Sequence, residues 1–245
     1  MQATQIPWVY CPIIPTDASC VVLSESEVHH ALRVLRCRPG ATVAVFNGDG
    51  AFRIGQLQPN GKACAVTFTE PLQTITCGCS EWQLVLALPN QSSTFDAILP
   101  KASELGIVYI QPVYTERTER GHWESIWEKR LDRWQRILIE ACKQAKNPYV
   151  PKLLTPIAFN QLPTKSLGAC FYGSLNASES AVQLPKTQSL YSVVVGPEGG
   201  FTADEEVLLA TFSTPVYLPT YVLRMETAVV GLVATLKMQA GYPYR

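Results

Sequence analysis

Two short segments in the last quarter of the chain carry residue types that could bind a small molecule and act on it. One is residues 196–201 (GPEGGF), and the other is residues 223–228 (LRMETA). Gly199 and Gly200 can adopt positive φ angles and have no side chain, so a ligand could approach the backbone there. The second segment places an arginine and a glutamate at the mouth of an apolar stretch.

The flanking sequence predicts the elements that position the first segment. Residues 192–195 (SVVV) are an apolar run typical of a buried strand. Thr202 and Glu205 have the spacing of a capping box, which predicts a helix that begins at Ala203. A strand, a glycine-rich turn and a helix N-terminus together form a common small-molecule site in α/β proteins.

Strand and helix patterns alternate after residue 80, and this alternation predicts a parallel α/β sheet. The expected strands are residues 82–88, 107–113, 169–172, 191–195 and 216–218. The expected helices are residues 94–105, 122–146, 203–212 and 227–239. Pro100 lacks a backbone N–H, so we expect a kink or a late start in the first of these helices. Trp127 and Trp134 follow the buried stripe of the second helix and fit core packing better than base stacking.

Roughly the first seventy residues are typical of a small, mainly β unit. Ser24 and Glu27 repeat the capping-box spacing and predict a short helix over residues 25–35. Strands are expected at residues 42–46, 52–57 and 64–69, with a hairpin turn at residues 47–50 (NGDG). Residues 71–80 are typical of a linker, so we divide the chain into domains of residues 1–75 and 76–245.

The composition limits the class of protein. The chain has 245 residues, of which 47% are hydrophobic and 16% are charged, so it can bury a substantial core. The formal net charge is zero, and any RNA contact must therefore depend on local patches. The chain lacks a signal-peptide pattern and a membrane-spanning apolar run, so we expect a cytoplasmic location with mostly reduced thiols. Cys77 and Cys79 form the only tight pair among eight cysteines, and we expect no metal site.

Several segments together resemble one known family. The matching segments are residues 29–40 (HHALRVLRCRPG), 101–106 (KASELG), 115–117 (TER), 196–201 and 223–228, with Glu140, Ala141, Gln144, Val150 and Pro151. In order and spacing they are similar to the RsmE family, the ribosomal RNA uridine N3-methyltransferases of the SPOUT superfamily. Because the matches cover nearly the whole chain, the resemblance is specific.

The resemblance implies a fold, a reaction and partners. The expected fold is a small N-terminal PUA-like β-barrel that helps to hold RNA, followed by an α/β methyltransferase domain with a trefoil knot near the C-terminus. The expected reaction is methyl transfer from S-adenosyl-L-methionine to N3 of a uridine in 16S ribosomal RNA, in the small ribosomal subunit. The family also implies a homodimer, with no membrane and no metal. The expected cofactor-binding residues are Gly196, Pro197, Gly199, Gly200, Leu218, Leu223 and Thr227.

Three charged residues are candidates for the chemistry. Uridine N3 carries a proton at neutral pH, so some group must accept that proton or stabilise the resulting anion. We expect Arg224 to face the negative charge that develops on the base carbonyls, while Glu226 or Glu198 orients it or acts as the base. Structural alternatives stay open: Arg224 and Glu226 could be a solvated ion pair, Glu198 a helix-dipole partner, and the glycines a simple tight turn.

Arg33, Arg36, Arg38 and Arg117 are the candidates for RNA contacts. The first three cluster beside the expected barrel, and clustered arginines suit phosphate groups. Ordinary surface charge is the alternative. We assign no chemistry to the adjacent His29 and His30.

Three positions depart from the usual pattern of the family. Pro219 stands where a glycine is usual, Met225 where a threonine is usual, and Asn147 where an arginine is common. Pro219 offers no backbone N–H to a cofactor, and Asn147 removes a phosphate contact. Two alternatives therefore stay open, namely another SPOUT methyltransferase with a different RNA and a catalytically silent RNA-binding or ribosome-assembly module.

Overall fold

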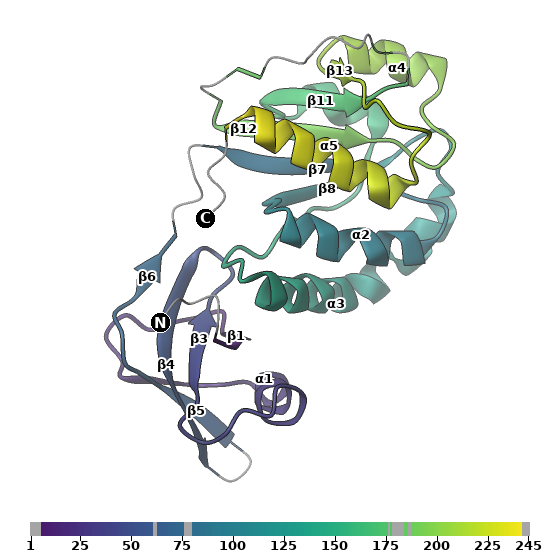
Figure 1. Ribbon diagram of the computed structural model, residues 1–245. Coiled ribbons are helices and arrows are strands. Elements are labelled where there is room, and N and C mark those ends of the chain that lie inside the picture. Colours follow the sequence, from purple (N-terminus) through teal and green to yellow (C-terminus); the bar gives the residue numbers. More distant parts are fainter. Residues whose placement is uncertain are drawn as a thin grey trace. The chain divides into compact units, whose positions relative to one another are not determined.

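A computed structural model of the chain describes residues 6–60, 63–75, 80–175, 177, 184–185 and 188–241. The chain divides into two compact units. We call them unit 1 (Met1–Thr76 with Ile139–Val150) and unit 2 (Cys77–Leu138 with Pro151–Arg245). Each unit has its own sheet (Figure 1). The expected cysteine pair, Cys77 and Cys79, lies outside the described residues.

The sheet of unit 1 has the strand order β1-β3-β4-β5-β2, and β6 pairs with β4. Its strands are β1 (Trp8–Tyr10), β2 (Cys20–Val22), β3 (Thr42–Phe46), β4 (Ala51–Asn60), β5 (Ala63–Phe68) and β6 (Gln73–Thr74). All pairings are antiparallel except that of β1 with β3. The three predicted strands are confirmed as β3, β4 and β5. The sequence does not predict β1, β2 or β6, because runs of two or three residues carry too little periodic pattern.

The predicted hairpin turn connects β3 with β4. The side-chain oxygen of Asn47 accepts hydrogen bonds from the N–H groups of Asp49 and Ala51, at 2.9 and 3.1 Å. Gly48 and Gly50 have φ angles of 85° and 94°, which other residues rarely adopt. The sheet and the helix beside it enclose a core formed by Val9, Leu23, Ala31, Val43, Val45, Leu57, Cys64 and Val66.

The helix predicted over residues 25–35 changes its geometry halfway. α1 (Glu25–His29) is an α-helix, and a π-helical turn, η2 (His30–Val34), follows it directly. Ser24 caps α1, because its hydroxyl accepts a hydrogen bond from the N–H of Glu27 at 3.4 Å. Arg36 then adopts a φ angle of 53°, and this left-handed residue marks the end of the helical segment.

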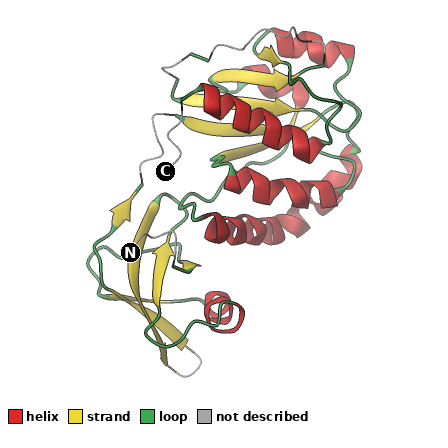
Figure 2. Ribbon diagram, viewed as in Figure 1, coloured by secondary structure: helices red, strands yellow, loops and turns green. Residues whose placement is uncertain are grey.

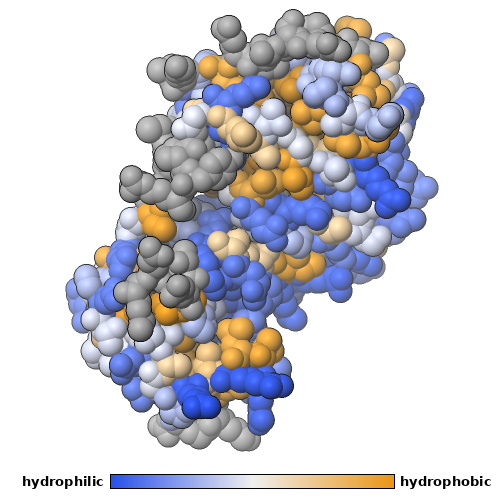
Figure 3. Space-filling view, in the orientation of Figure 1, coloured by the Kyte–Doolittle hydropathy of each residue, from blue (hydrophilic) through white to orange (hydrophobic). Residues whose placement is uncertain are grey.

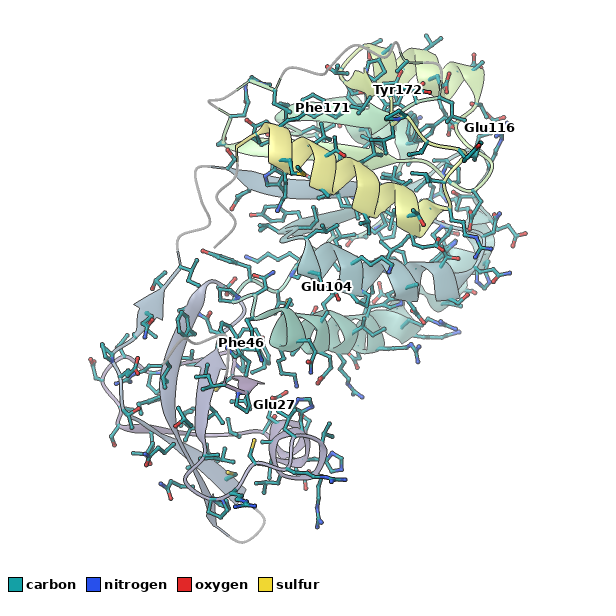
Figure 4. The ribbon with its side chains drawn as sticks, viewed as in Figure 1. Glu27, Phe46, Glu104, Glu116, Phe171 and Tyr172 are labelled. Atoms are coloured by element: carbon teal, nitrogen blue, oxygen red, sulfur yellow. The ribbon has the colours of Figure 1, made fainter. Side chains whose placement is uncertain are left out.

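A buried ion pair joins the two chain segments of unit 1. Lys143 lies near the end of α3 (Arg120–Ala145), and its side chain is 1% exposed. Its ammonium lies 2.9 Å from Oε1 of Glu27 (labelled in Figure 4) and 2.5 Å from Oε1 of Glu140. The other oxygen of Glu27 accepts a hydrogen bond from the N–H of Tyr10 at 3.0 Å. Both oxygens of the buried Glu27 carboxylate are therefore satisfied.

Unit 2 contains a parallel sheet with the strand order β10-β8-β7-β12-β11-β13, and β9 pairs with β8. Its strands are β7 (Glu81–Ala87), β8 (Tyr109–Tyr114), β9 (Lys152–Leu153), β10 (Ile157–Ala158), β11 (Ala169–Gly173), β12 (Leu190–Val195) and β13 (Thr214–Val216). The predicted parallel α/β sheet is thus confirmed. From β7 the chain continues to β8, which lies on one side of β7. The later strands β11 and β12 lie on the other side of β7. The direction in which strands are added to the sheet therefore reverses between β7 and β12.

Helices cover this sheet (Figure 2). Besides α3 they are α2 (Ser92–Glu104), α4 (Ala203–Ala210) and α5 (Met225–Gln239), and η3 (Phe159–Thr164) is a 3-10 helix. α2 does not start late but begins at Ser92 and continues through Pro100. α5 packs against α2 and β12 (Figure 1). Trp127 and Trp134 are buried against Phe95 of α2, which confirms their predicted place in the core.

Candidate cofactor site

A cavity of about 380 Å³ lies in unit 2 at the carboxyl ends of β11, β12 and β13. The last residue of each of these strands lines it, namely Gly173, Val195 and Val216. Open parallel sheets bind ligands at this edge, beside the point where the strand order reverses. The topology therefore places the cavity where a ligand site is expected.

The cavity brings together residues from both segments that the sequence singles out. Those that line it are Gly196, Pro197, Glu198, Gly199, Gly200, Leu218 and Leu223. Thr227, Arg224 and Glu226 are not among its lining residues. Met225, which lies between Arg224 and Glu226, does line the cavity, and it is buried.

The glycine-rich turn has a defined backbone. The N–H of Gly200 donates to the carbonyl of Pro197 at 2.9 Å, and Gly200 has a φ angle of 74°. A Cβ on Gly196 would lie 2.9 Å from the ring of Phe201. A side chain at position 196 or 200 would therefore distort the turn that forms one wall of the cavity.

Contacts outside the cavity hold this turn in place. The carboxylate of Glu198 accepts the N–H of Asn90, with both oxygens at 3.2 Å. The guanidinium of Arg117 donates to the carbonyls of Gly199 and Gly200. Glu198 thus has a backbone partner in the loop before α2, and Arg117 contacts the cofactor turn directly.

Glu205 adds a third contact at the end of the turn. Its Oε2 accepts the N–H of Thr202 at 2.9 Å, which closes the predicted capping box of α4. Its Oε1 accepts the N–H of Glu116 at 2.8 Å, from the loop after β8 (Figure 4). A single buried carboxylate therefore joins the start of α4 to the residue next to Arg117.

The N-terminus of α5 presents the second segment. Arg224 is the N-cap residue, with an extended backbone and an exposed side chain, and Glu226 lies in the first turn. The salt bridges found among the described residues involve neither Arg224 nor Glu226. The guanidinium of Arg224 is thus available at the edge of the cavity beside Met225.

Sequence reasoning does not find all of the cavity wall. The additional polar and aromatic lining includes Ser174, Glu206, Thr220 and Tyr221. Burial, and to a smaller extent the charge of Glu206, raises the pKa of the Tyr172 phenol on β11 (Figure 4). Glu206 lies in the first turn of α4, so the capping box was the one local signal that could have found it.

The chemistry of the lining fits S-adenosyl-L-methionine. Most of the wall is apolar, as the adenine and the sulfonium group require. The charged residues on it are Glu198 and Glu206, and no lysine or arginine is among the lining residues that the structure describes. Two carboxylates and no cation favour a positively charged ligand.

The other predicted RNA contacts lie in unit 1. Arg33 belongs to the π-helical turn, and Arg36 and Arg38 follow it. All three side chains are exposed, and none takes part in the salt bridges found among the described residues. Exposed arginines without carboxylate partners can contact phosphates.

Comparison with known families defines the class of this protein. Residues 79–237 match the RNA methyltransferase domain family, and residues 23–69 match the RNA methyltransferase PUA domain family. The fold with the cavity is that of an RNA methyltransferase, and an N-terminal PUA domain precedes it.

Individual relatives narrow the class to one family. Ribosomal RNA small subunit methyltransferase E of Synechocystis sp. is 31% identical, over 85% of this chain and 69% of the relative. The enzyme of the same name from Aquifex aeolicus is 29% identical, over 88% of this chain and 93% of the relative. The structure of this methyltransferase from Neisseria gonorrhoeae, bound to S-adenosyl methionine, superposes with a TM-score of 0.82 at 28% identity, covering 96% of this chain and 98% of that one. The chain belongs to the family of ribosomal RNA small subunit methyltransferase E.

Two further findings concern membranes and metals. None of the helices in the described part of the chain is long and apolar enough to cross a membrane. Among the described residues, no group of three or more histidine, cysteine, aspartate or glutamate side chains is arranged to hold a metal ion.

Proposed function

We propose that this protein methylates N3 of a uridine in 16S ribosomal RNA, with S-adenosyl-L-methionine as the methyl donor. The observation that carries the proposal is the cavity at the carboxyl ends of β11, β12 and β13, which the glycine-rich turn and residues 220–223 line. Membership of the family supports the RNA substrate, and the cofactor in the Neisseria gonorrhoeae structure supports the donor.

The cavity residues would hold and orient the donor. When bound, S-adenosyl-L-methionine supplies an electrophilic methyl group on a positively charged sulfur. Leu218 and Leu223 would exclude water from the site, and the lack of side chains at Gly199 and Gly200 would let the donor approach the backbone of the turn. Since the reaction is an in-line displacement, correct positioning of the two reactants lowers the barrier substantially.

Arg224 is the residue that we assign to the uridine ring of the substrate. Its exposed guanidinium stands at the start of α5, next to the cavity residue Met225, and none of the salt bridges between described residues involves it. It would stabilise the negative charge on the uridine carbonyls as N3 loses its proton. Glu226 or Glu198 would accept that proton or orient Arg224. Glu198 lines the cavity, but its carboxylate accepts a hydrogen bond from the N–H of Asn90. This contact favours a positioning role for Glu198 over that of the proton acceptor.

The RNA would be held mainly by residues 1–75, with Arg33, Arg36 and Arg38 on phosphates, while residues 76–245 carry out the transfer. This division implies that RNA binding weakens strongly with salt, whereas cofactor binding changes little. The location would be the cytoplasm, where ribosomal RNA is made and assembled. We also place the trefoil knot of the family at the segments that line the cavity.

A homodimer is part of the same proposal. Several large apolar side chains at α4, at α5 and in the preceding loop are exposed, namely Val207, Tyr221, Val222, Val230 and Met238. Hydrophobic colour is visible over α5 in Figure 3. An apolar surface beside the cavity supports association with a second copy of the chain.

The decisive experiment follows a labelled methyl group from S-adenosyl-L-methionine into small ribosomal subunits that lack their modifications. We expect label on N3 of one uridine, mapped by mass spectrometry. The variant Arg224→Ala should lose at least ~100-fold in turnover, with cofactor affinity within about twofold of the wild type, because one charge-stabilising donor is worth that much. Arg136→Ala, an exposed arginine on α3, is the matched control and should behave as the wild type.

Each outcome has a clear meaning. Label at another position or in another RNA would replace the substrate in this proposal. Cofactor binding without transfer to any RNA would identify a silent binding module, for which the unusual Met225 in the cavity wall would be the first suspect. Full turnover by Arg224→Ala would remove Arg224 from the mechanism.

A further inference from the structure

Arg117 makes an unusual contact for a residue that the sequence assigns to RNA. Its Nη1 donates to the carbonyl of Gly199 and, at 3.3 Å, to that of Gly200. Both acceptors belong to the turn that lines the cofactor cavity, whereas Arg117 itself is not a lining residue. The guanidinium therefore touches the binding turn without touching the space that a ligand would fill.

We propose that Arg117 is a positioning residue for the methyl donor. It strengthens donor binding by fixing the backbone of the glycine-rich turn. The inference rests on the proposed function, because the turn must bind S-adenosyl-L-methionine for its position to matter. Arg117 is not assigned a contact with the donor or with the reacting base. An RNA contact by its remaining donors, Nε and Nη2, is compatible with this role.

The surroundings of Arg117 keep it next to the turn. The N–H of Glu116, its chain neighbour, donates to Glu205, and the same carboxylate accepts the N–H of Thr202 just beyond the turn. On the other side, Thr118 donates to the carbonyl of Leu88 at 3.3 Å. Contacts on both sides of Arg117 thus fix its backbone. Only the side chain of Arg117 loses conformational freedom when it binds the two carbonyls.

Gly199 shows how closely Arg117 approaches the turn. A Cβ at this position would lie 3.1 Å from Cδ and 3.3 Å from Nη1 of Arg117, and its three nearest heavy atoms all belong to Arg117. Unlike Gly200, Gly199 does not have a positive φ angle. The backbone would therefore accept alanine at position 199, but its methyl group would press on the side chain of Arg117, which would have to shift.

The physical effect is preorganisation. A charged donor binds carbonyl oxygens more strongly than a neutral one does, and two bonds to successive carbonyls fix the orientation of both peptide planes. A binding turn that is already ordered loses less conformational freedom when its ligand arrives. Without Arg117 the turn would sample more conformations, and binding of the donor would weaken before any step of the reaction.

The test measures binding of S-adenosyl-L-methionine in the absence of RNA, by calorimetric titration. Arg117→Ala should weaken binding about tenfold, and Arg117→Lys should recover part of the loss, because an ammonium can donate to a carbonyl but does not reproduce the position of Nη1 between the two acceptors. Arg120→Ala is the matched control. This arginine lies three residues further on, is exposed and pairs with Glu124, so its loss should leave binding unchanged.

A double-mutant cycle separates this role from a general loss of structure. Gly199→Ala should weaken cofactor binding in the wild type, because its new methyl group displaces Arg117. In the Arg117→Ala background the same substitution meets no obstacle, so its further effect should be under about twofold. Additive effects of the two substitutions would overturn the proposed coupling.

Turnover gives a further check. Arg117→Ala should raise KM for the donor about tenfold and leave kcat at saturating donor within about twofold, a split that a general folding defect would not produce. If Arg117→Ala binds the donor like the wild type and loses only RNA affinity, the positioning role is refuted and a phosphate contact remains. Failure of the wild type to bind the donor would instead refute the proposed function, so the two outcomes are distinct.

Discussion

Two glutamates stand three residues after a hydroxyl residue that caps a helix, one in each unit of the molecule. In unit 2, Glu205 returns to the N–H of Thr202 and closes the capping box. In unit 1, Glu27 has the same spacing from Ser24, yet its carboxylate binds Lys143 and the N–H of Tyr10 instead. The local sequence is alike in the two units, but the partners of the carboxylate differ.

The difference shows what a capping signal does and does not specify. In both units the hydroxyl accepts the N–H of the glutamate at 3.4 Å, so the start of each helix follows from the local sequence. Each carboxylate also reaches a distant segment, Glu205 to Glu116 and Glu27 to Lys143. In unit 1 the buried ammonium of Lys143 competes with the backbone N–H for Glu27, and the charged partner wins because a buried carboxylate without a cation would be very costly.

The largest effect should come from the ion pair of unit 1. Lys143→Met leaves the Glu27 carboxylate buried with one backbone donor, and should lower the free energy of unfolding by about 3 kcal/mol. The double variant Glu27→Gln with Lys143→Met removes both charges and should recover more than half of that loss. Lys129→Met, at an exposed position of α3, is the control. Urea denaturation measures all of them, and equal midpoints for Lys143→Met and Lys129→Met would contradict a stabilising pair.

An intermediate effect is expected from Glu205. Glu205→Gln keeps one acceptor, but its amide group would face an N–H donor at Thr202 or Glu116, so we expect a loss of about 1–2 kcal/mol in stability. Because the contacts of Glu205 fix the residue directly after the glycine-rich turn, donor binding should also weaken by about fivefold. The exposed neighbour Asp204→Asn should change neither quantity. A loss of stability with unchanged donor binding would show that the capping box and the turn are independent.

The smallest effect should come from the two hydroxyl caps. Ser24→Ala and Thr202→Ala each remove one cap, and each should cost about 1 kcal/mol in the same denaturation experiment. Near-equal losses here, beside unequal losses for Lys143→Met and Glu205→Gln, would confirm that the units share the cap and differ in the partners of the carboxylate. A difference above about 1 kcal/mol between the caps would place the contrast in the hydroxyl residues instead.

Periodic pattern was enough to predict most of the elements that position the site. The apolar run before Gly196 forms β12, the Thr202 cap starts α4, and the last helix begins within the second segment, at Met225, two residues before the predicted start. The sequence could not show that Met225 rather than Arg224 or Glu226 lines the cavity, because the direction of a side chain at a helix start depends on the preceding loop. Glu206 was missed for a similar reason, since only the assembled sheet brings α4 next to β11.

The remaining differences between the sequence and the structure have separate origins. Asn147, which departs from the family pattern, accepts the N–H of Tyr149 at 3.0 Å and shapes the chain after α3. Nothing in the structure explains Pro219, which is exposed. The parallel pairing of β1 with β3 has no local signal either, because it joins residues that are more than thirty positions apart.

The composition of unit 1 from two chain segments has a consequence for the growing chain on the ribosome. Glu27 and Lys143 are separated by 116 positions, and Tyr149 packs on Gly50 of the hairpin. At a synthesis rate of roughly 5–20 residues per second, the N-terminal segment waits on the order of ten seconds for these partners. During that time the newly made helix α1 carries a carboxylate without its cation, and chaperones could meet it in that state. The first unit to begin synthesis is therefore not complete until α3, which begins in the second unit and ends in the first, has been made.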